Sequence, residues 1–313
     1  MRGAVGIDLG GSFVKAVAVS PRGRVLARDR RPTEAARGAG AIVQNIAAAA
    51  GAVAERAGLR PPRRIGVGVP GVLERRRGVV LAAPNLAPLV GFPLRRALER
   101  ATGARAFLEN DANAAALGER WRGAGGDDFL LITLGTGVGG GLVLGGSLWI
   151  GPGGMAGEFG HVAVDAGGPR CGCGARGCVE AFASAQAVIR EARGAIESGE
   201  GGSFVPRDGG DPDPAEVARA ARQGDPRAKR IFEGAGRALG VGVASVVQLL
   251  DLRRFVVAGG LANALDLMLP ALRSEVATRT FGRDAAKIEV LPSRLGEEGG
   301  TIGAARLALE GRR

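Results

Sequence analysis

The chain has 313 residues, and 46% of them are hydrophobic, which is typical of a folded protein and excludes a disordered one. This length favours two domains over one. The formal net charge is +11, a balance that can attract nucleic acid, anionic lipid or a phosphate-rich substrate. The basic runs lack interleaved aromatic residues and match no nucleic-acid-binding motif. We therefore interpret the charge as a general preference for arginine and expect no nucleic-acid partner.

Neither a signal peptide nor a membrane span is expected. The first apolar stretch, residues 4–9, is short and contains Asp8. Residues 129–157 carry no charge and are long enough to cross a bilayer, but their many glycines favour turns. The three cysteines lie close together without a secretory signal, which indicates a reducing compartment and a metal site rather than disulfides. We therefore expect a cytoplasmic protein without a membrane partner.

Apolar strands and helical segments alternate along the chain, which predicts an α/β fold. Strands are expected at residues 5–9, 14–19, 24–28, 64–69, 104–108, 129–134, 141–144, 254–258 and 287–291. Helices are expected at residues 35–57, 94–102, 114–120, 183–196, 225–250, 265–279 and 300–310, with a further helix start at 213–216.

One pattern occurs twice: an apolar strand, a glycine-rich turn with a hydroxyl residue, and a returning strand. The two turns are Gly10-Gly11-Ser12 and Gly135-Thr136-Gly137. Backbone N–H groups in such turns can hold phosphate oxygens, and two of them suggest a triphosphate held between two related domains. Asp8, at the end of the first strand, is placed to hold Mg²⁺ on the phosphates. Ordinary hairpin turns remain the alternative, because neither turn has the spacing of a P-loop.

Two further strand ends leave their roles open. Asp111 follows a strand and opens a helix, so it is either a helix N-cap or a general base for a substrate hydroxyl. In the second case Asn110 would position the same substrate. Gly259 and Gly260 follow a later strand, where they either border an adenosine or form an ordinary helix entry turn.

All histidine and cysteine residues of the chain lie between Glu158 and Glu180. They are His161, Cys171, Cys173 and Cys178. Three thiolates and one imidazole form the ligand set of a closed, tetrahedral zinc site, whose metal is structural. The alternative is a set of reduced cysteines without metal. In a zinc site the second ring nitrogen of His161 stays free for a neighbour such as a substrate hydroxyl.

Together these segments resemble the ROK family (repressor, open reading frame, kinase) and, within it, the bacterial glucokinases. The motifs that carry the resemblance are Asp8-Leu9-Gly10-Gly11-Ser12, Val69-Pro70-Gly71, Glu109-Asn110-Asp111-Ala112-Asn113, Gly135-Thr136-Gly137-Val138-Gly139, Glu158-Phe159-Gly160-His161, Cys171-Gly172-Cys173-Gly174 and Gly177-Cys178-Val179-Glu180. The resemblance implies an actin-like ATPase (ribonuclease H-like) fold with two domains and an interdomain cleft. The expected small domain is 1–113, completed by the C-terminal helix 297–313, and the expected large domain is 114–296, with the zinc loop 158–180.

The resemblance also implies roles for these residues in transferring the γ-phosphoryl group of ATP to the 6-hydroxyl of glucose. Asp111 would act as general base. The implied sugar contacts are Gly71, Asn85, Asn110, Asp111, Glu158, His161 and Glu180. The implied nucleotide and Mg²⁺ contacts are Asp8, Gly10, Gly11, Ser12, Thr136, Gly137, Gly259 and Gly260. Zinc would be held by the cysteines and histidine named above.

Several alternatives stay open. Another ROK member could act on N-acetylglucosamine, N-acetylmannosamine or fructose, and polyphosphate could replace ATP. A sugar-sensing regulator without catalytic activity is less consistent with Asp111, and we expect no DNA-binding segment, because only seven residues precede Asp8. Members of the family are often oligomers, so a homodimer or homotetramer is expected.

Overall fold

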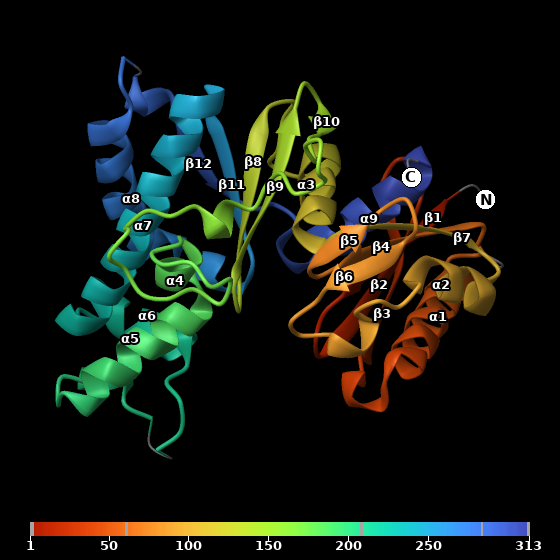
Figure 1. Cartoon of the computed structure of the whole chain (residues 1–313), viewed down its shortest axis with the longest axis horizontal. Coiled ribbons are helices and arrows are strands. Elements are labelled where there is room, and N and C mark those ends of the chain that lie inside the picture. The colour runs from red at the N-terminus through yellow and green to blue at the C-terminus, as the bar shows by residue number, and fades with distance from the viewer. Residues whose placement is uncertain (1–2, 60–61, 207–208, 283, 312–313) are drawn as a thin grey trace. The chain divides into compact units, whose positions relative to one another are not determined.

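The computed structural model describes residues 3–59, 62–206, 209–282 and 284–311. The chain folds into two compact units (Figure 1). Unit 1 comprises residues 1–127, 141–156 and 293–313, and unit 2 comprises residues 128–140 and 157–292. The domain boundaries expected from the sequence stay a prediction, and the last two residues of the expected helix 297–313 lie outside the described residues.

The main sheet of unit 1 has five strands in the order β3-β2-β1-β4-β7. They are β1 (Ala4–Leu9), β2 (Phe13–Val19), β3 (Val25–Pro32), β4 (Arg64–Val69) and β7 (Arg105–Asn110). β1, β4 and β7 run parallel, and their register aligns Asp8 with Gly68 and Gly68 with Glu109. The carboxyl ends of the three strands therefore lie at one edge of the sheet, where α/β proteins bind ligands.

The two faces of this sheet follow from the alternation along β1. Val5 and Ile7 belong to the apolar core that includes residues of α1 (Ala39–Arg56). Gly6 faces the opposite side, where a Cβ atom would approach the carbonyl oxygen of Thr301 to 1.9 Å. Successive strand residues point to opposite faces, so glycine at this position allows α9 (Gly299–Glu310) to pack directly on the strands.

Helix α3 (Asp111–Arg122) packs against α9 through residues without side chains. A Cβ atom on Gly303 would lie 1.6 Å from the carbonyl oxygen of Ala114, and one on Gly118 would lie 2.3 Å from that of Gly299. These close approaches require glycine and hold α3, whose first residue is Asp111, at a fixed place beside the sheet.

The remaining elements of unit 1 include a hairpin that the sequence did not predict. It is formed by β5 (Val72–Glu74) and β6 (Val79–Ala82), which are joined by a turn containing Arg75, Arg76 and Arg77. The strands are short and the basic turn masks their apolar pattern, so no period-2 signal was visible. Helix α2 (Leu94–Thr102) packs on β7 and beside α1.

The second five-stranded sheet has the order β10-β9-β8-β11-β12. Its strands are β8 (Phe129–Leu134), β9 (Val138–Leu144), β10 (Ser147–Leu148), β11 (Arg254–Ala258) and β12 (Glu289–Pro292). The strand expected at 287–291 therefore begins two residues later, because a short 3-10 helix, Ala285–Lys287, precedes it.

The helices of unit 2 are arranged around one long helix, α7 (Pro226–Leu250). The others, α4 (Glu180–Ala183), α5 (Ala185–Glu197), α6 (Pro214–Arg222) and α8 (Leu265–Arg279), all pack against it. Asp225 caps α7 by accepting from the N–H groups of Arg227 and Ala228, each at 3.0 Å, and Pro226 occupies the first helical position.

Short 3-10 helices elsewhere in the chain lie at Ala35–Arg37, Ala87–Leu89, Phe159–His161, Gly202–Phe204, Gly260–Ala264 and Gly296–Glu298.

Within the described parts of the chain, every helix is too short or too polar to cross a membrane.

Candidate active site and metal centre

The residues predicted to act in catalysis and binding form two groups, one in each unit. In unit 1, α3 begins at Asp111, three residues earlier than expected, and Asn110 is its N-cap. The side-chain oxygen of Asn110 accepts a hydrogen bond from the N–H of Asn113 at 3.1 Å. The alternative that Asp111 serves as the cap is therefore wrong. Its carboxylate accepts a hydrogen bond from the N–H of Ala112 at 2.9 Å.

Two carboxyl groups lie near each other at this edge of the sheet. Burial raises the pKa of Asp111 above its ordinary value. Burial and, second, the charge of Asp111 raise the pKa of Asp8 to about 6, while the charge of Lys15 lowers it. Two desolvated carboxylates disfavour each other's ionisation, and a cation held by one of them relieves that cost. Oxygen donors are the ligands that Mg²⁺ prefers, so Asp8 fits the expected magnesium.

The first glycine turn presents free backbone donors. The N–H of Gly10 donates to the carbonyl of Phe13 at 2.9 Å. The N–H groups of Gly11 and Ser12, both exposed, have no hydrogen-bond partner among the described residues. Thr33, which is fully buried, fixes the turn: its hydroxyl donates to the Gly10 carbonyl at 2.7 Å. The turn is therefore shaped as a phosphate cradle would be, and Thr33 is a contributor that the sequence did not reveal.

The two other predicted sugar contacts of unit 1 lie in the same region. Gly71 has φ +101°, and a Cβ atom there would lie 2.0 Å from the carbonyl oxygen of Ala82, so only glycine fits. Its own carbonyl accepts a hydrogen bond from the side-chain amide of Asn110 at 3.2 Å. Asn85 is exposed and lies beside Gly11, with 3.4 Å between its Cβ atom and the place of a Cβ on that glycine.

In unit 2 the structure brings the histidine and the three cysteines together. Their ligand atoms all lie within 4.8 Å of one another. The Sγ atoms of Cys173 and Cys178 are 3.7 Å apart, and Sγ of Cys171 lies 3.7 Å from Nδ1 of His161. A zinc–sulfur bond of 2.3 Å in a tetrahedron places two ligands roughly 3.8 Å apart. The two distances of 3.7 Å match this separation, and the four residues are the ligand set of a closed zinc site.

The protonation of the thiols responds to their surroundings. Burial raises the pKa of Cys171 to about 12 and also raises the pKa of Cys178. A hydrogen bond from the backbone of Ala175 lowers the pKa of Cys173. Zinc binds thiolates, so metal binding at this cluster would release protons from the two buried thiols.

Two carboxylates adjoin the cluster. With Nδ1 of His161 directed at Cys171, its Nε2 is left on the side of Glu158, whose Oε2 is 4.0 Å away. Glu180 begins α4; its Oε1 accepts from Sγ of Cys171 at 3.3 Å, and its Oε2 accepts from the N–H of Val138 at 3.0 Å. Glu180 thus connects the metal cluster with the second glycine turn.

This second turn resembles the first in its free donors. Gly135 donates to the carbonyl of Gly137 at 2.9 Å, whereas the N–H groups of Thr136 and Gly137 have no partner within the described ranges. A Cβ atom on Gly137 would lie 2.4 Å from Oε2 of Glu180. A side chain at 137 would therefore displace the Glu180 carboxylate.

Gly259 and Gly260 lie at the end of β11, as expected. Gly259 has φ +94°, and a Cβ atom on it would lie 2.3 Å from the carbonyl oxygen of Leu134. The fold itself therefore requires glycine at 259. A Cβ atom on Gly260 would meet nothing within 4 Å, so open space adjoins the start of the 3-10 helix Gly260–Ala264.

The geometry can be compared with known proteins. The ROK family matches residues 4–311. A glucokinase of Thermotoga maritima is 37% identical over 311 residues, which cover 98% of this chain and 97% of the relative. The chain belongs to the ROK family.

Solved structures of ROK proteins agree with this assignment. A ROK hexokinase of Thermus thermophilus has a TM-score of 0.86 at 39% identity, and the match covers 99% of both chains. A ROK glucokinase of Streptomyces griseus in complex with glucose and AMPPNP has a TM-score of 0.83 at 35% identity, covering 99% of this chain and 100% of the other. The expected α/β, actin-like ATPase fold is confirmed by this similarity. An N-acetylmannosamine kinase of Escherichia fergusonii is 33% identical over 307 residues, covering 96% of this chain and 97% of the relative.

This ROK-family chain also has a contact in unit 1 that the sequence analysis missed. Arg75, which the sequence analysis attributed to a general preference for arginine, forms an ion pair with the buried carboxylate of Glu109. No local spacing connects the two residues, which are 34 positions apart.

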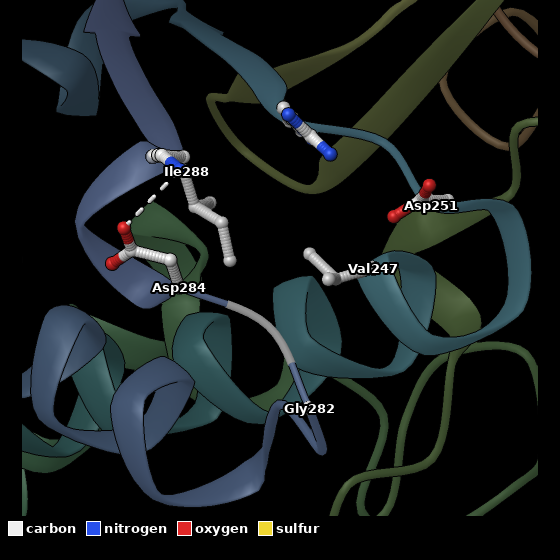
Figure 2. A pocket seen from close by; sticks show the side chains of 7 residues that line it. Val247, Asp251, Gly282, Asp284 and Ile288 are labelled. Carbon is white, nitrogen blue, oxygen red and sulfur yellow. Dashed lines mark ion pairs between the residues drawn. The ribbon is translucent and has the colours of Figure 1, made fainter.

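A separate cavity of about 290 Å³ in unit 2 is lined by none of the residues predicted for catalysis or binding. Figure 2 shows it between the end of α7, at Val247 and Asp251, and the segment with Gly282, Asp284 and Ile288. Lys287 forms an ion pair with Asp284 at 3.6 Å beside it.

Proposed function

We propose that this chain is a glucokinase that transfers the γ-phosphoryl group of ATP to the 6-hydroxyl of glucose. The observation that carries the proposal is the position of Asp111 directly after the N-cap of α3 and the burial of its carboxyl group. Asn110, and not Asp111, caps helix α3, so the carboxyl group of Asp111 is not used as the cap, and burial raises its pKa above the ordinary value. A general base works best when its pKa approaches the working pH. The similarity to glucokinases over nearly the whole chain supports glucose as the acceptor.

In this mechanism Asp111 accepts the proton of the sugar hydroxyl as that hydroxyl attacks the phosphorus atom. Asn110 and the carbonyl of Gly71 fix the strand end next to the base, as their hydrogen bond of 3.2 Å indicates. The free N–H groups of the two glycine turns would hold the phosphates of ATP, and Asp8 would hold Mg²⁺. When bound, the cation neutralises charge on the phosphates, which is most of what phosphoryl transfer requires besides positioning.

The zinc cluster has a supporting role in the proposal. A closed Cys₃His site leaves no coordination position for water, so its metal would not act as a Lewis acid. Instead the metal would hold His161 with Nε2 free, and would keep Glu158 and Glu180 beside it. These three side chains, together with Asn110, Gly71 and Asn85, would bind the hydroxyl groups of the sugar.

A second candidate acceptor is an N-acetylhexosamine, favoured by the similarity to an N-acetylmannosamine kinase. The deciding experiment measures ADP release with ATP and a panel of glucose, fructose, mannose, N-acetylglucosamine and N-acetylmannosamine. The proposal predicts the highest kcat/KM for glucose. A higher value for an N-acetylated sugar would replace glucose as the substrate, and no turnover with any sugar would refute a sugar kinase.

Three smaller points belong to the same proposal. Polyphosphate should give no product under conditions in which ATP does. The protein should be a homodimer or homotetramer, which light scattering during size-exclusion chromatography measures. Its location should be the cytoplasm, where a tagged protein would be seen by microscopy.

A further inference from the structure

Arg75 connects three separate segments of unit 1. Its guanidinium group donates to Glu109 through Nε, at 2.9 Å from Oε2, and also through Nη2 to Oε1. Its other terminal nitrogen, Nη1, donates to the carbonyl oxygen of Gly154 at 2.8 Å. The side chain is 17% exposed and that of Glu109 is 6% exposed. One partly buried guanidinium therefore joins the β5–β6 hairpin, the end of β7 and the loop around Gly154.

The carboxylate that Arg75 holds also fixes the backbone that leads to the catalytic base. Oε1 of Glu109 accepts from the N–H of Asn110 at 2.8 Å and from the side-chain amide of Asn113 at 3.0 Å. Glu109 therefore binds a residue before Asp111 and a residue after it, and so fixes the start of α3. A planar guanidinium that binds a carboxylate through two nitrogens fixes its orientation, which a lysine ammonium does not.

The same hairpin makes a second connection to this junction. Gly71, immediately before β5, accepts from the side-chain amide of Asn110 at 3.2 Å. Arg75 immediately follows β5 and binds Glu109. The segment 71–75 is therefore attached at both ends to the last two residues of β7, immediately before α3, and Arg75 provides the charged attachment.

The loop on the other side of Arg75 is built to receive it. Gly154 has φ +74°, and a Cβ atom there would lie 2.6 Å from Nη1 of Arg75. The loop is closed by bonds of its own, from Gly154 N–H to the Gly151 carbonyl at 3.2 Å and from Ala156 N–H to the Ile150 carbonyl at 3.0 Å. Its chain continues to Glu158, a proposed sugar contact, four residues after Gly154.

We infer that Arg75 is a positioning residue for the sugar acceptor. It does not touch substrate; it sets the place of Asn110 and Asp111 through Glu109, and the place of the loop that leads to Glu158 through Gly154. This inference rests on the proposed function, because the acceptor is the sugar of that reaction. It assigns Arg75 to recognition of the sugar and not of the nucleotide.

The test compares Arg75→Lys with Arg76→Lys. Lysine at 75 keeps a positive charge next to Glu109 but has a single nitrogen in place of the three that bind Glu109 and Gly154. Arg76 is an exposed arginine in the same turn, whose side chain has no ion pair within the described residues, so it is a matched control. We expect R75K to raise KM for glucose about tenfold, since small displacements of positioning groups have large kinetic effects. KM for ATP, and both constants of R76K, should change by less than about twofold.

A second measurement does not depend on turnover. Hydrogen–deuterium exchange should be faster in R75K than in wild type or R76K at residues 151–156 and at the N–H groups of Ala112 and Asn113. The full chain is used for every variant. Addition of guanidinium ion at millimolar concentration to Arg75→Ala should lower its KM for glucose again, because the ion can occupy the vacated place.

The outcomes separate this inference from the proposed function. An unchanged KM for glucose in R75K overturns the inference, even if exchange is faster, because Arg75 would then be structural only. An equal rise in both Michaelis constants also overturns it. If the wild-type chain phosphorylates no sugar, the proposed function fails. In that case unchanged hydrogen–deuterium exchange in R75K would overturn the inference about Arg75 as well. Faster exchange at both segments, together with weaker binding of glucose in calorimetry, would support the inference about Arg75.

Discussion

Sγ of Cys171 lies 3.3 Å from Oε1 of Glu180, so a thiol of the metal cluster contacts the carboxylate that also receives the N–H of Val138. Glu180 is proposed to bind the sugar, and Val138 follows the turn proposed to bind phosphate. The Cys/His cluster and the second glycine turn therefore share one carboxylate, which is also a proposed sugar contact. A change at any of the three should be measurable at the other two.

Removal of the metal is the first test of this relationship. Purified protein should contain about one zinc per chain by elemental analysis, from the Cys₃His ligand count. Cys178→Ser should lose the metal and lower kcat/KM for glucose by about tenfold or more, the range found when ligand surroundings of metals are disturbed. Its midpoint of thermal unfolding should also fall, because binding energy of a structural metal is folding energy. A zinc-free preparation with full activity would contradict the assignment.

Gly137→Ala tests the contact between the second turn and Glu180. The new Cβ would come within 2.4 Å of Oε2 of Glu180 and displace the carboxylate. We expect KM for glucose to rise about tenfold, with a further effect on KM for ATP because the turn itself is disturbed. Gly135→Ala is the matched control, since a Cβ there meets nothing within 4 Å. Equal effects of the two substitutions would show that the Glu180 contact is unimportant.

Asp111→Asn tests the general base. Asparagine preserves the size of the side chain and can still start the helix, because Asn110 is the cap. Loss of a general base lowers the rate by about 10²- to 10⁴-fold, so kcat should fall in that range while glucose binding, measured by calorimetry, persists. Asp127→Asn, at a carboxylate with 76% exposure, should leave kcat unchanged. Turnover by D111N close to the wild-type rate would remove Asp111 from the mechanism.

Asp8 should make the stability of the protein depend on pH in the absence of Mg²⁺. Its pKa of about 6, against 3.8 for an ordinary aspartate, means that the folded state binds more protons than the unfolded state between these values. Stability therefore falls as pH rises through that window, by roughly 3 kcal/mol when complete. Below pH 3.8 the carboxyl is protonated in both states and this penalty is absent.

Asp8→Asn removes the ionisable group and supplies the comparison. The free energy of unfolding of D8N should exceed that of the wild type at pH 7.5 by more than it does at pH 4, as measured by denaturant titration without Mg²⁺. Mg²⁺ should stabilise the wild type and have less effect on D8N. A difference between the two proteins that stays constant with pH would mean that Asp8 titrates normally.

Local sequence patterns were sufficient to predict that the histidine and the three cysteines come together, and to predict the two glycine turns. Ligands of one zinc ion can be provided by one loop, so the spacing of His161, Cys171, Cys173 and Cys178 already predicted their assembly. Most strands and helices were also predicted from hydrophobic periodicity, which is a property of neighbouring residues. The placement of Asp111 at a strand end was predicted on the same basis, but its role was left open.

Only the tertiary structure decided the roles that depend on distant partners. Thr33 fixes the first glycine turn, and Arg75 is half-buried against Glu109 while Arg76 and Arg77 beside it are exposed. The sequence by itself indicated what local spacing can specify: the family, the candidate zinc ligands and the candidate base. Which arginine is buried, and which polar side chain supports which turn, depends on packing between segments far apart in the chain. That packing leaves no periodic signal, because each contact is made once and in three dimensions.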